Sequence, residues 1–240
     1  MTRTLGFATV SLDATPFALL DLDDTLVDSA PPMRAWALDL CARYGLPESG
    51  AQRFLSARKD YPTWRAFVAE VARSFGLAAE ADAWSADLLA DYPRRFVLEP
   101  EVARRLGSLR AAGWRLGIVT NGETDLQSAK IHHTALVSYV DAVCISEAVG
   151  ARKPDRAVFE SAARALGVGL GPHGWMVGDT LDTDVVGGNG AGLRTAWLSA
   201  AACGDLPETA AETFGRARHA WPDYVCSSIV DALDMLLGAS

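Results

Sequence analysis

The stretch that decides the fold is TPFALLDLDDTL, residues 15–26. Its first part, residues 15–22, is a short apolar run that ends in acidic residues. Such a run is typical of a strand that is buried on both faces of a parallel sheet. We therefore expect a buried strand over residues 15–22, with the carboxyl groups of Asp21, Asp23 and Asp24 near its carboxyl end.

From residue 99 onward, strand-like and helix-like patterns alternate along the chain. The predicted strands cover residues 114–119, 141–145, 174–177, 194–198 and 224–227. The predicted helices cover residues 101–112, 124–136, 154–166 and 182–190, and a closing helix runs to about residue 237. Strands that alternate with helices favour a parallel sheet with helices on both faces. The predicted fold class is therefore α/β, with a Rossmann-like doubly wound sheet.

Residues 31–98 interrupt this alternation, because they carry helical patterns and no convincing strand. The clearest pattern is an apolar stripe at helical spacing, formed by Trp64, Phe67, Val68, Val71 and Phe75. We expect an all-helical domain over residues 31–98, inserted into an α/β core made of residues 1–30 and 99–240. The stripe is predicted to be the core of the inserted domain, and Trp36, Tyr61 and Trp64 are aromatic candidates for lining a ligand pocket.

The composition is that of an ordinary globular protein with an acidic balance of charge. Half of the 240 residues are hydrophobic, 22% are charged, and the formal net charge is −8. A negative field of this kind disfavours nucleic-acid polymers and anionic membranes as partners. The four cysteines are dispersed without a CxxC pair, no apolar run approaches the roughly 18 residues of a membrane helix, and the first residues do not resemble a signal peptide. We therefore expect a cytoplasmic protein.

Polar residues cluster where four of the predicted strands or their loops end. The clusters are Asp21 to Thr25, Thr120 to Gly122, Arg152 to Pro154, and Gly178 to Asp184. In open α/β sheets, ligands bind at the carboxyl edge of the strands. Four clusters at one edge therefore predict a binding or catalytic site there.

The residue types in these clusters indicate phosphoryl transfer. The carboxylates of Asp21, Asp23, Asp179 and Asp184 would repel one another without a hard cation, so the sequence predicts Mg²⁺ as a cofactor. The Thr120 hydroxyl, the backbone amides of Asn121 and Gly122, and the Lys153 ammonium group are predicted donors to a phosphate. We expect Asp24 and Asp182 to be capping or solvated residues instead.

The series DLDDTL (21–26), VTNG (119–122), RKPD (152–155) and VGDTLDTD (177–184) resembles the four motifs of the haloacid dehalogenase (HAD) superfamily. Within it, the pattern is most similar to the pyrimidine 5′-nucleotidase and N-acylneuraminate-9-phosphatase type. The resemblance implies a phosphatase for a small phosphorylated metabolite, with the helical insertion as its cap domain. Ala135 stands where these proteins commonly carry the glycine that ends a helix, and Gly190 stands where an Asn is usual.

The resemblance also implies a role for each motif residue. Asp21 would attack phosphorus and form an aspartyl-phosphate, and Asp23 would protonate the leaving alcohol and later activate water. Asp21, the backbone carbonyl of Asp23, and Asp179 would hold Mg²⁺, with Asp184 ordering those ligands. The predicted phosphate-binding residues are Thr120, Asn121, Gly122 and Lys153.

Several functions remain open at this stage. The leading one is a phosphomonoesterase, with a nucleoside monophosphate as the favoured substrate and a sugar or carboxylic-acid phosphate as the next choice. A phosphomutase would use the same aspartyl-phosphate, and a 2-haloacid dehalogenase would use the same nucleophile. A dehalogenase needs neither the second acid nor the metal, so Asp23 together with Asp179 argues against it. A binding protein on an inactive phosphatase fold is the alternative from another class.

Overall fold

The computed structural model describes residues 15–57, 63–199 and 221–238. Six parallel strands form one sheet in the order β3-β2-β1-β4-β5-β6. The strands are β1 (Phe17–Leu20), β2 (Arg115–Thr120), β3 (Ala142–Ile145), β4 (Gly174–Gly178), β5 (Arg194–Leu198) and β6 (Tyr224–Cys226). Strands β1, β2 and β3 follow one another toward one edge of the sheet, and β4, β5 and β6 follow one another toward the other edge. The direction of winding therefore switches between β1 and β4, which are neighbours. The predicted Rossmann-like parallel sheet is confirmed.

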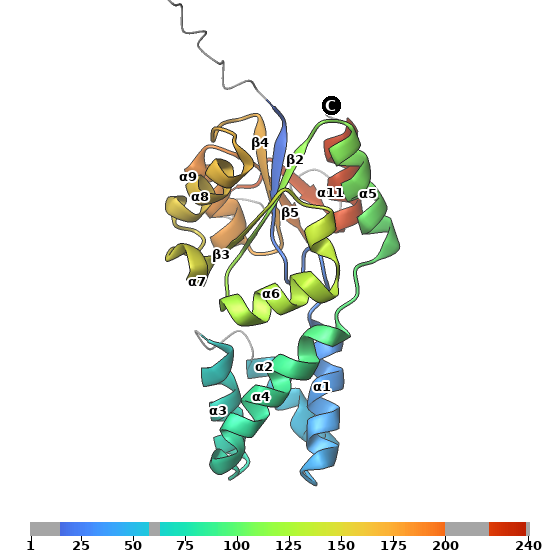
Figure 1. Cartoon of the computed structure of the whole chain (residues 1–240), viewed down its shortest axis with the longest axis vertical. Coiled ribbons are helices and arrows are strands. Elements are labelled where there is room, and N and C mark those ends of the chain that lie inside the picture. Colours follow the sequence, from blue (N-terminus) through green and yellow to red (C-terminus); the bar gives the residue numbers. More distant parts are fainter. Residues whose placement is uncertain (1–14, 58–62, 200–220, 239–240) are drawn as a thin grey trace, which may run out of the picture.

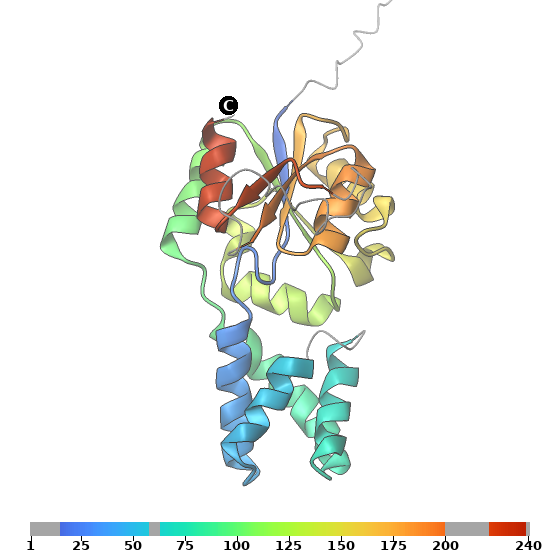
Figure 2. The ribbon, with the colours of Figure 1, turned by 180° about the vertical axis from the view of Figure 1, so that it is seen from behind.

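Side chains of β1 alternate between two hydrophobic cores, as the two-residue period of a strand requires. Ala18 and Leu20 belong to the core beneath α5 (Pro100–Ala111), α6 (Thr124–His133) and α11 (Ile229–Gly238). Phe17 and Leu19 belong to the core beneath α8 (Arg156–Leu166) and α9 (Val186–Ala191). Figures 1 and 2 show α5 and α11 on one side of the sheet and α8 and α9 on the other, with α6 at the end of the sheet that is nearer to the helical bundle. All four of these β1 side chains are fully buried, which explains why the stretch reads as continuously apolar.

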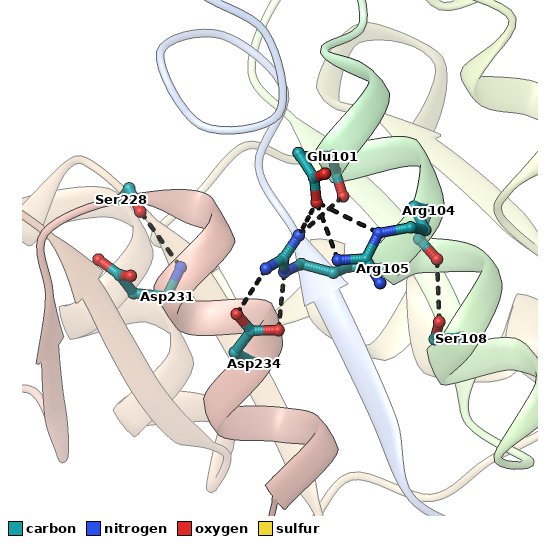
Figure 3. Close-up of polar contacts among 7 residues, drawn as sticks. All are labelled: Glu101, Arg104, Arg105, Ser108, Ser228, Asp231 and Asp234. Carbon is teal, nitrogen blue, oxygen red and sulfur yellow. Dashed lines mark hydrogen bonds and ion pairs between the residues drawn. The ribbon is translucent and has the colours of Figure 1, made fainter.

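An ion pair joins α5 to α11 across one face of the sheet. The Arg105 guanidinium donates to both carboxylate oxygens of Asp234, from Nε at 2.7 Å and from Nη2 at 2.8 Å, and it also contacts Glu101 on its own helix (Figure 3). Two parallel hydrogen bonds of this kind fix orientation as well as distance. The pair therefore adds an oriented contact between α5 and α11, beside the buried Ala232, Leu233 and Leu236 of α11.

Residues between β1 and α5 form a separate bundle below the carboxyl edge of the sheet (Figures 1 and 2). Its helices are α1 (Ala30–Arg43), α2 (Ala51–Ala57), α3 (Trp64–Ser74) and α4 (Ala81–Asp91), followed by the short turn η3 (Tyr92–Arg95). Phe54 lies at the centre, with ring centroids 5.3 Å from Trp36 and 6.0 Å from Phe67. Phe67, Val68 and Val71 of the apolar stripe are buried in this bundle, as expected for a core stripe. No described helix has the length and apolar character needed to cross a membrane.

Most elements differ from their predicted bounds by one to three residues, and two of the differences have clear local features. The first strand ends at Leu20, because the chain turns sharply at Asp24, whose φ is 60° and whose amide donates to the Val27 carbonyl. The helix predicted over residues 182–190 begins instead with a wide turn, Leu181–Val185, before α9. Glycine at position 188 lets α9 lie close to the sheet, since a Cβ there would stand 2.8 Å from side-chain atoms of both Met176 and Thr195.

Candidate active site

The predicted clusters meet at the carboxyl edge of the sheet, where the winding switches between β1 and β4. Asp21 directly follows β1, and its amide donates to the Val177 carbonyl of β4 at 3.0 Å. Thr120 is the last residue of β2, and Asp179 directly follows β4. Lys153 arrives from the loop that precedes α8. The parallel strands thus bring residues as distant in sequence as Asp21 and Asp179 to the carboxyl edge, where ligands bind in open sheets.

Lys153 lies between two buried carboxylates. Its Nζ is 2.7 Å from Asp21 Oδ1 and 2.6 Å from Asp184 Oδ1, and all three residues are buried. Burial raises the pKa of Asp21 to about 7; the Lys153 charge opposes this rise and the Asp184 charge adds to it. The two carboxylates raise the pKa of Lys153 even though its burial acts in the opposite direction. One ammonium group therefore does not neutralise the negative charge gathered here.

The site offers oxygen ligands to a hard cation. Asp21, Asp179 and Asp184 each present a carboxylate oxygen, and these atoms lie within 4.8 Å of one another. The Thr180 amide donates to Asp184 Oδ2 at 3.0 Å, and Trp197 Nε1 donates to the Asp179 carbonyl at 2.8 Å, so both acids are held in place. An all-oxygen acidic set with a raised carboxyl pKa fits Mg²⁺. Asp182 is exposed and outside the cluster, as expected.

The residues of the second motif have partners that the sequence does not reveal. The Asn121 side chain holds the Lys153 backbone, donating to its carbonyl at 3.0 Å and accepting from its amide at 2.8 Å. The Gly122 amide donates to Ser146 Oγ at 3.0 Å, so this predicted phosphate donor has a partner within the protein. Thr120 Oγ1 accepts a hydrogen bond from Gln127 at 2.7 Å, which leaves its own hydroxyl hydrogen to be donated elsewhere.

Asp23 does not join the acidic cluster with its side chain. Lys130 Nζ contacts both of its carboxylate oxygens, at 2.7 and 2.9 Å, and Gln127 Nε2 donates to Oδ2 at 2.8 Å. Sequence reasoning missed both residues. The available signal was that Gln127 and Lys130 fall on the same face of the predicted helix as Leu126 and Ile131, where polar side chains are unexpected. Asp24 accepts hydrogen bonds from the backbone amide and the hydroxyl of Ser29, the residue that precedes α1.

A sequence profile of the haloacid dehalogenase-like hydrolases matches residues 17–192. The chain belongs to this family. The match covers all four motifs and the helical bundle between the first two. The predicted resemblance is confirmed, since curated relatives include a pyrimidine 5′-nucleotidase and other phosphatases of the same superfamily.

Two relatives and one solved structure illustrate how the similarity is distributed. The glyceraldehyde 3-phosphate phosphatase of Pyrococcus abyssi is 33% identical over 188 residues, 74% of this chain and 79% of that protein. The pyrimidine 5′-nucleotidase YjjG of Escherichia coli is 42% identical, but only over 86 residues, which are 36% of this chain and 38% of the nucleotidase. A HAD phosphatase from Thermococcus onnurineus has a TM-score of 0.65 at 26% identity, covering 92% of this chain and 97% of that one.

Solved haloacid dehalogenases also share the fold of this HAD-like hydrolase, each at less than 25% identity. Such similarity shows the fold alone. Two relatives that are more than 30% identical over most of their length are phosphatases, the glyceraldehyde 3-phosphate phosphatase and a phosphoserine phosphatase of Thermus thermophilus. Like these relatives, this member of the family is an enzyme, a phosphoric monoester hydrolase.

A cavity of about 360 Å³ lies between the carboxyl edge of the sheet and the helical bundle. The sheet side is polar and contains the motif residues. The bundle side is mostly apolar and is lined by Met33, Trp64, Phe67, Leu88 and Tyr92. Of the aromatic candidates, Trp64 lines the cavity, Trp36 is buried in the bundle core instead, and Tyr61 lies outside the described residues.

The bundle of this HAD-like hydrolase is joined to the core beside the cavity mouth. The Trp64 amide donates to Glu123 at 2.8 Å, and the Trp64 indole donates to Asp125 at 3.2 Å. The Arg65 guanidinium pairs with both of these carboxylates. Arg65 is half exposed, so solvent screens its two ion pairs. These contacts connect the start of α3 to the start of α6.

Proposed function

We propose that this HAD-like hydrolase is a Mg²⁺-dependent phosphatase that cleaves a small phosphate monoester through an aspartyl-phosphate on Asp21. The observation that carries the proposal is the environment of Asp21. Its carboxylate lies at the polar end of a cavity, beside the buried Lys153 ammonium group and two further carboxylates. A nucleophile, a phosphate-binding cation and ligands for a metal are thereby supplied at one point.

Under this proposal, Asp21 and Asp179 hold Mg²⁺ together with the backbone carbonyl of Asp23, and Asp184 orders these ligands. When bound, the metal supplies positive charge that offsets the charge of the phosphate and of the surrounding carboxylates. Asp184 also fixes Lys153, which is 2.6 Å from it, so the ammonium group remains directed at the nucleophile. The deeply buried Lys153 has no alternative partner in bulk solvent.

The chain's own residues then account for the proton and bond changes. Asp21 attacks phosphorus, the new bond forms to its carboxylate oxygen, and the bond from phosphorus to the leaving oxygen breaks. Asp23 starts in its protonated form and gives that proton to the leaving oxygen; as a carboxylate it then takes a proton from the water that attacks the aspartyl-phosphate, which regenerates Asp21 and protonated Asp23 and releases phosphate. Thr120 and Lys153 donate to the transferring phosphoryl oxygens, with the Asn121 amide as a further donor and the Gly122 amide available once it leaves Ser146 Oγ.

The helical bundle, residues 31–98, is proposed as a cap on an α/β core of residues 1–30 and 99–240. Its apolar lining supports a leaving group with an apolar or aromatic face, so a nucleoside monophosphate stays the favoured substrate. The longer alignment with the glyceraldehyde 3-phosphate phosphatase supports a small sugar or acid phosphate as the second candidate. We propose a cytoplasmic setting, in keeping with the free thiols of Cys41 and Cys144.

A dehalogenase shares the fold and the nucleophile, and it is the second reaction considered. The acidic cluster and the second acid, Asp23, support phosphoryl transfer instead, because a dehalogenase has no use for either. Turnover of p-nitrophenyl phosphate with Mg²⁺, its loss in EDTA, and its loss in Asp21→Asn are the expected results. The matched control is Asp182→Asn, on the same edge but exposed, which should remain active. Release of halide from a 2-haloacid without phosphatase activity would overturn the proposal.

A panel of phosphorylated metabolites separates the two substrate candidates. Pyrimidine monophosphates should be among the better substrates, judged by kcat/KM. If every nucleotide is poor while small sugar or acid phosphates are cleaved well, the nucleotide assignment is wrong and the phosphatase assignment stands.

A further inference from the structure

The ammonium group of Lys130 is enclosed by groups from two other parts of the chain. It contacts both carboxylate oxygens of Asp23, on the loop after β1, and it lies 5.5 and 5.0 Å from the ring centroids of Tyr92 and Phe96. Lys130 itself belongs to α6 and is only 4% exposed. None of the four motifs includes it.

This arrangement restrains Asp23 at both oxygens. Lys130 binds Oδ1 and Oδ2, and Gln127 donates to Oδ2 while also reaching Thr120. The Asp23 side chain is 29% exposed, so without these donors it could rotate toward water. A proton-transfer residue must lie within hydrogen-bond reach of the leaving oxygen, and a displacement of about 1 Å can lower a rate by roughly 10²-fold.

The aromatic rings restrain Lys130 in turn. Tyr92 is in η3 and Phe96 directly follows it, in the connection that leads from the helical bundle back to α5. Their faces stabilise a cation by the cation–π interaction, which is strongest where water is excluded. The centroids of the two rings are 4.9 Å apart, so the rings pack together and form one wall beside the ammonium group.

We propose that Lys130 is the positioning residue for Asp23: it holds the proton-transfer carboxylate at the site, and the Tyr92–Phe96 wall holds Lys130. The inference rests on the proposed function, because it assigns Asp23 the proton transfer. It adds a residue outside the motifs and links the return connection of the helical bundle to the chemistry. Lys130 does not touch the substrate in this role; it acts only through Asp23.

The experiment compares two substrates of nearly equal shape, phenyl phosphate and p-nitrophenyl phosphate, by kcat/KM. This quantity reports the steps through departure of the leaving group, and p-nitrophenolate departs without much need of a proton. Lys130→Met should lower kcat/KM for phenyl phosphate by about 10²-fold and for p-nitrophenyl phosphate by only a few-fold. Lys130→Arg should restore part of the loss, because it keeps the charge and the donors.

A double-mutant cycle separates positioning from a general structural role. Asp23→Asn should show the same dependence on the leaving group, and adding Lys130→Met to it should lower kcat/KM little further. His133→Met, on the exposed face of the same helix, is the matched control and should leave both substrates unaffected. Met packs well against aromatic rings, so the variant is expected to fold, which circular dichroism checks.

Each outcome has a distinct meaning. Equal losses for both substrates in Lys130→Met, or additive losses in the double variant, overturn the positioning role while the phosphatase stands. Equal losses for both substrates in Asp23→Asn instead contradict the proposed proton transfer by Asp23, on which the inference depends.

Discussion

The pKa of Asp21 has a direct consequence for metal binding. Burial, reinforced by the Asp184 charge and opposed by Lys153, raises it to about 7 in the metal-free protein. Below pH 7 this carboxyl is mostly protonated, and Mg²⁺ must displace the proton before the oxygen can act as a ligand. The sign is therefore fixed: Mg²⁺ binds more weakly as the pH falls. An ordinary Asp, with a pKa near 4, would give no such change in this range.

The magnitude follows from the ionised fraction. A group with a pKa of 7 is roughly 90% ionised at pH 8 and roughly 10% ionised at pH 6, so the dissociation constant for Mg²⁺ should rise by about tenfold between these values. Isothermal titration calorimetry in two buffers of different ionisation enthalpy measures both this constant and the number of protons released. Asp182→Asn should behave as wild type. A Mg²⁺ affinity that is constant from pH 6 to 8, with no proton released, refutes the reasoning.

Three further changes have defined expectations. Arg65→Ala should raise KM by roughly fivefold or less and leave the melting temperature nearly unchanged, because half-exposed ion pairs contribute about 1 kcal/mol or less; an effect that does not shrink in high salt would contradict this. Ala135→Gly should raise the free energy of unfolding in urea by roughly 0.5–1 kcal/mol. Ala135 has a φ of 56°, and the strain of this left-handed conformation costs more than the additional conformational entropy that glycine loses on folding. An unchanged free energy of unfolding would show that the turn is unstrained. Replacing residues 31–98 by a short linker should lower kcat/KM sharply for the best metabolite and much less for p-nitrophenyl phosphate; equal losses would contradict a cap that selects the leaving group.

The sequence pattern was sufficient to predict the parallel sheet, because a strand that is buried on both faces has an unbroken apolar run, such as the one that ends at Leu20. It also placed the polar clusters, because parallel strands bring their carboxyl ends to one edge. Asp21, Lys153, Asp179 and Asp184 meet there as expected, although they come from three separate connections of the fold.

Contacts between distant side chains were beyond the reach of periodicity. Lys130 and Asp23 are 107 positions apart, and a lysine on an amphipathic helix normally belongs to the solvated face. Its burial depends on a carboxylate and on the rings of Tyr92 and Phe96, which come from other elements. The hydrogen bond from the Gly122 amide to Ser146 is of the same kind, because it joins the ends of neighbouring strands.

Trapping the covalent intermediate tests the central claim most directly. A single turnover of substrate on the Mg²⁺-loaded enzyme is quenched in acid within milliseconds, and the peptides are examined by mass spectrometry. We expect one phosphoryl group on the peptide that contains Asp21, sensitive to hydroxylamine as an acyl phosphate is, forming and decaying as fast as turnover requires. Asp21→Asn should carry none. Phosphate bound to another residue, or turnover at full rate with no phosphorylated peptide at any time, would contradict the account.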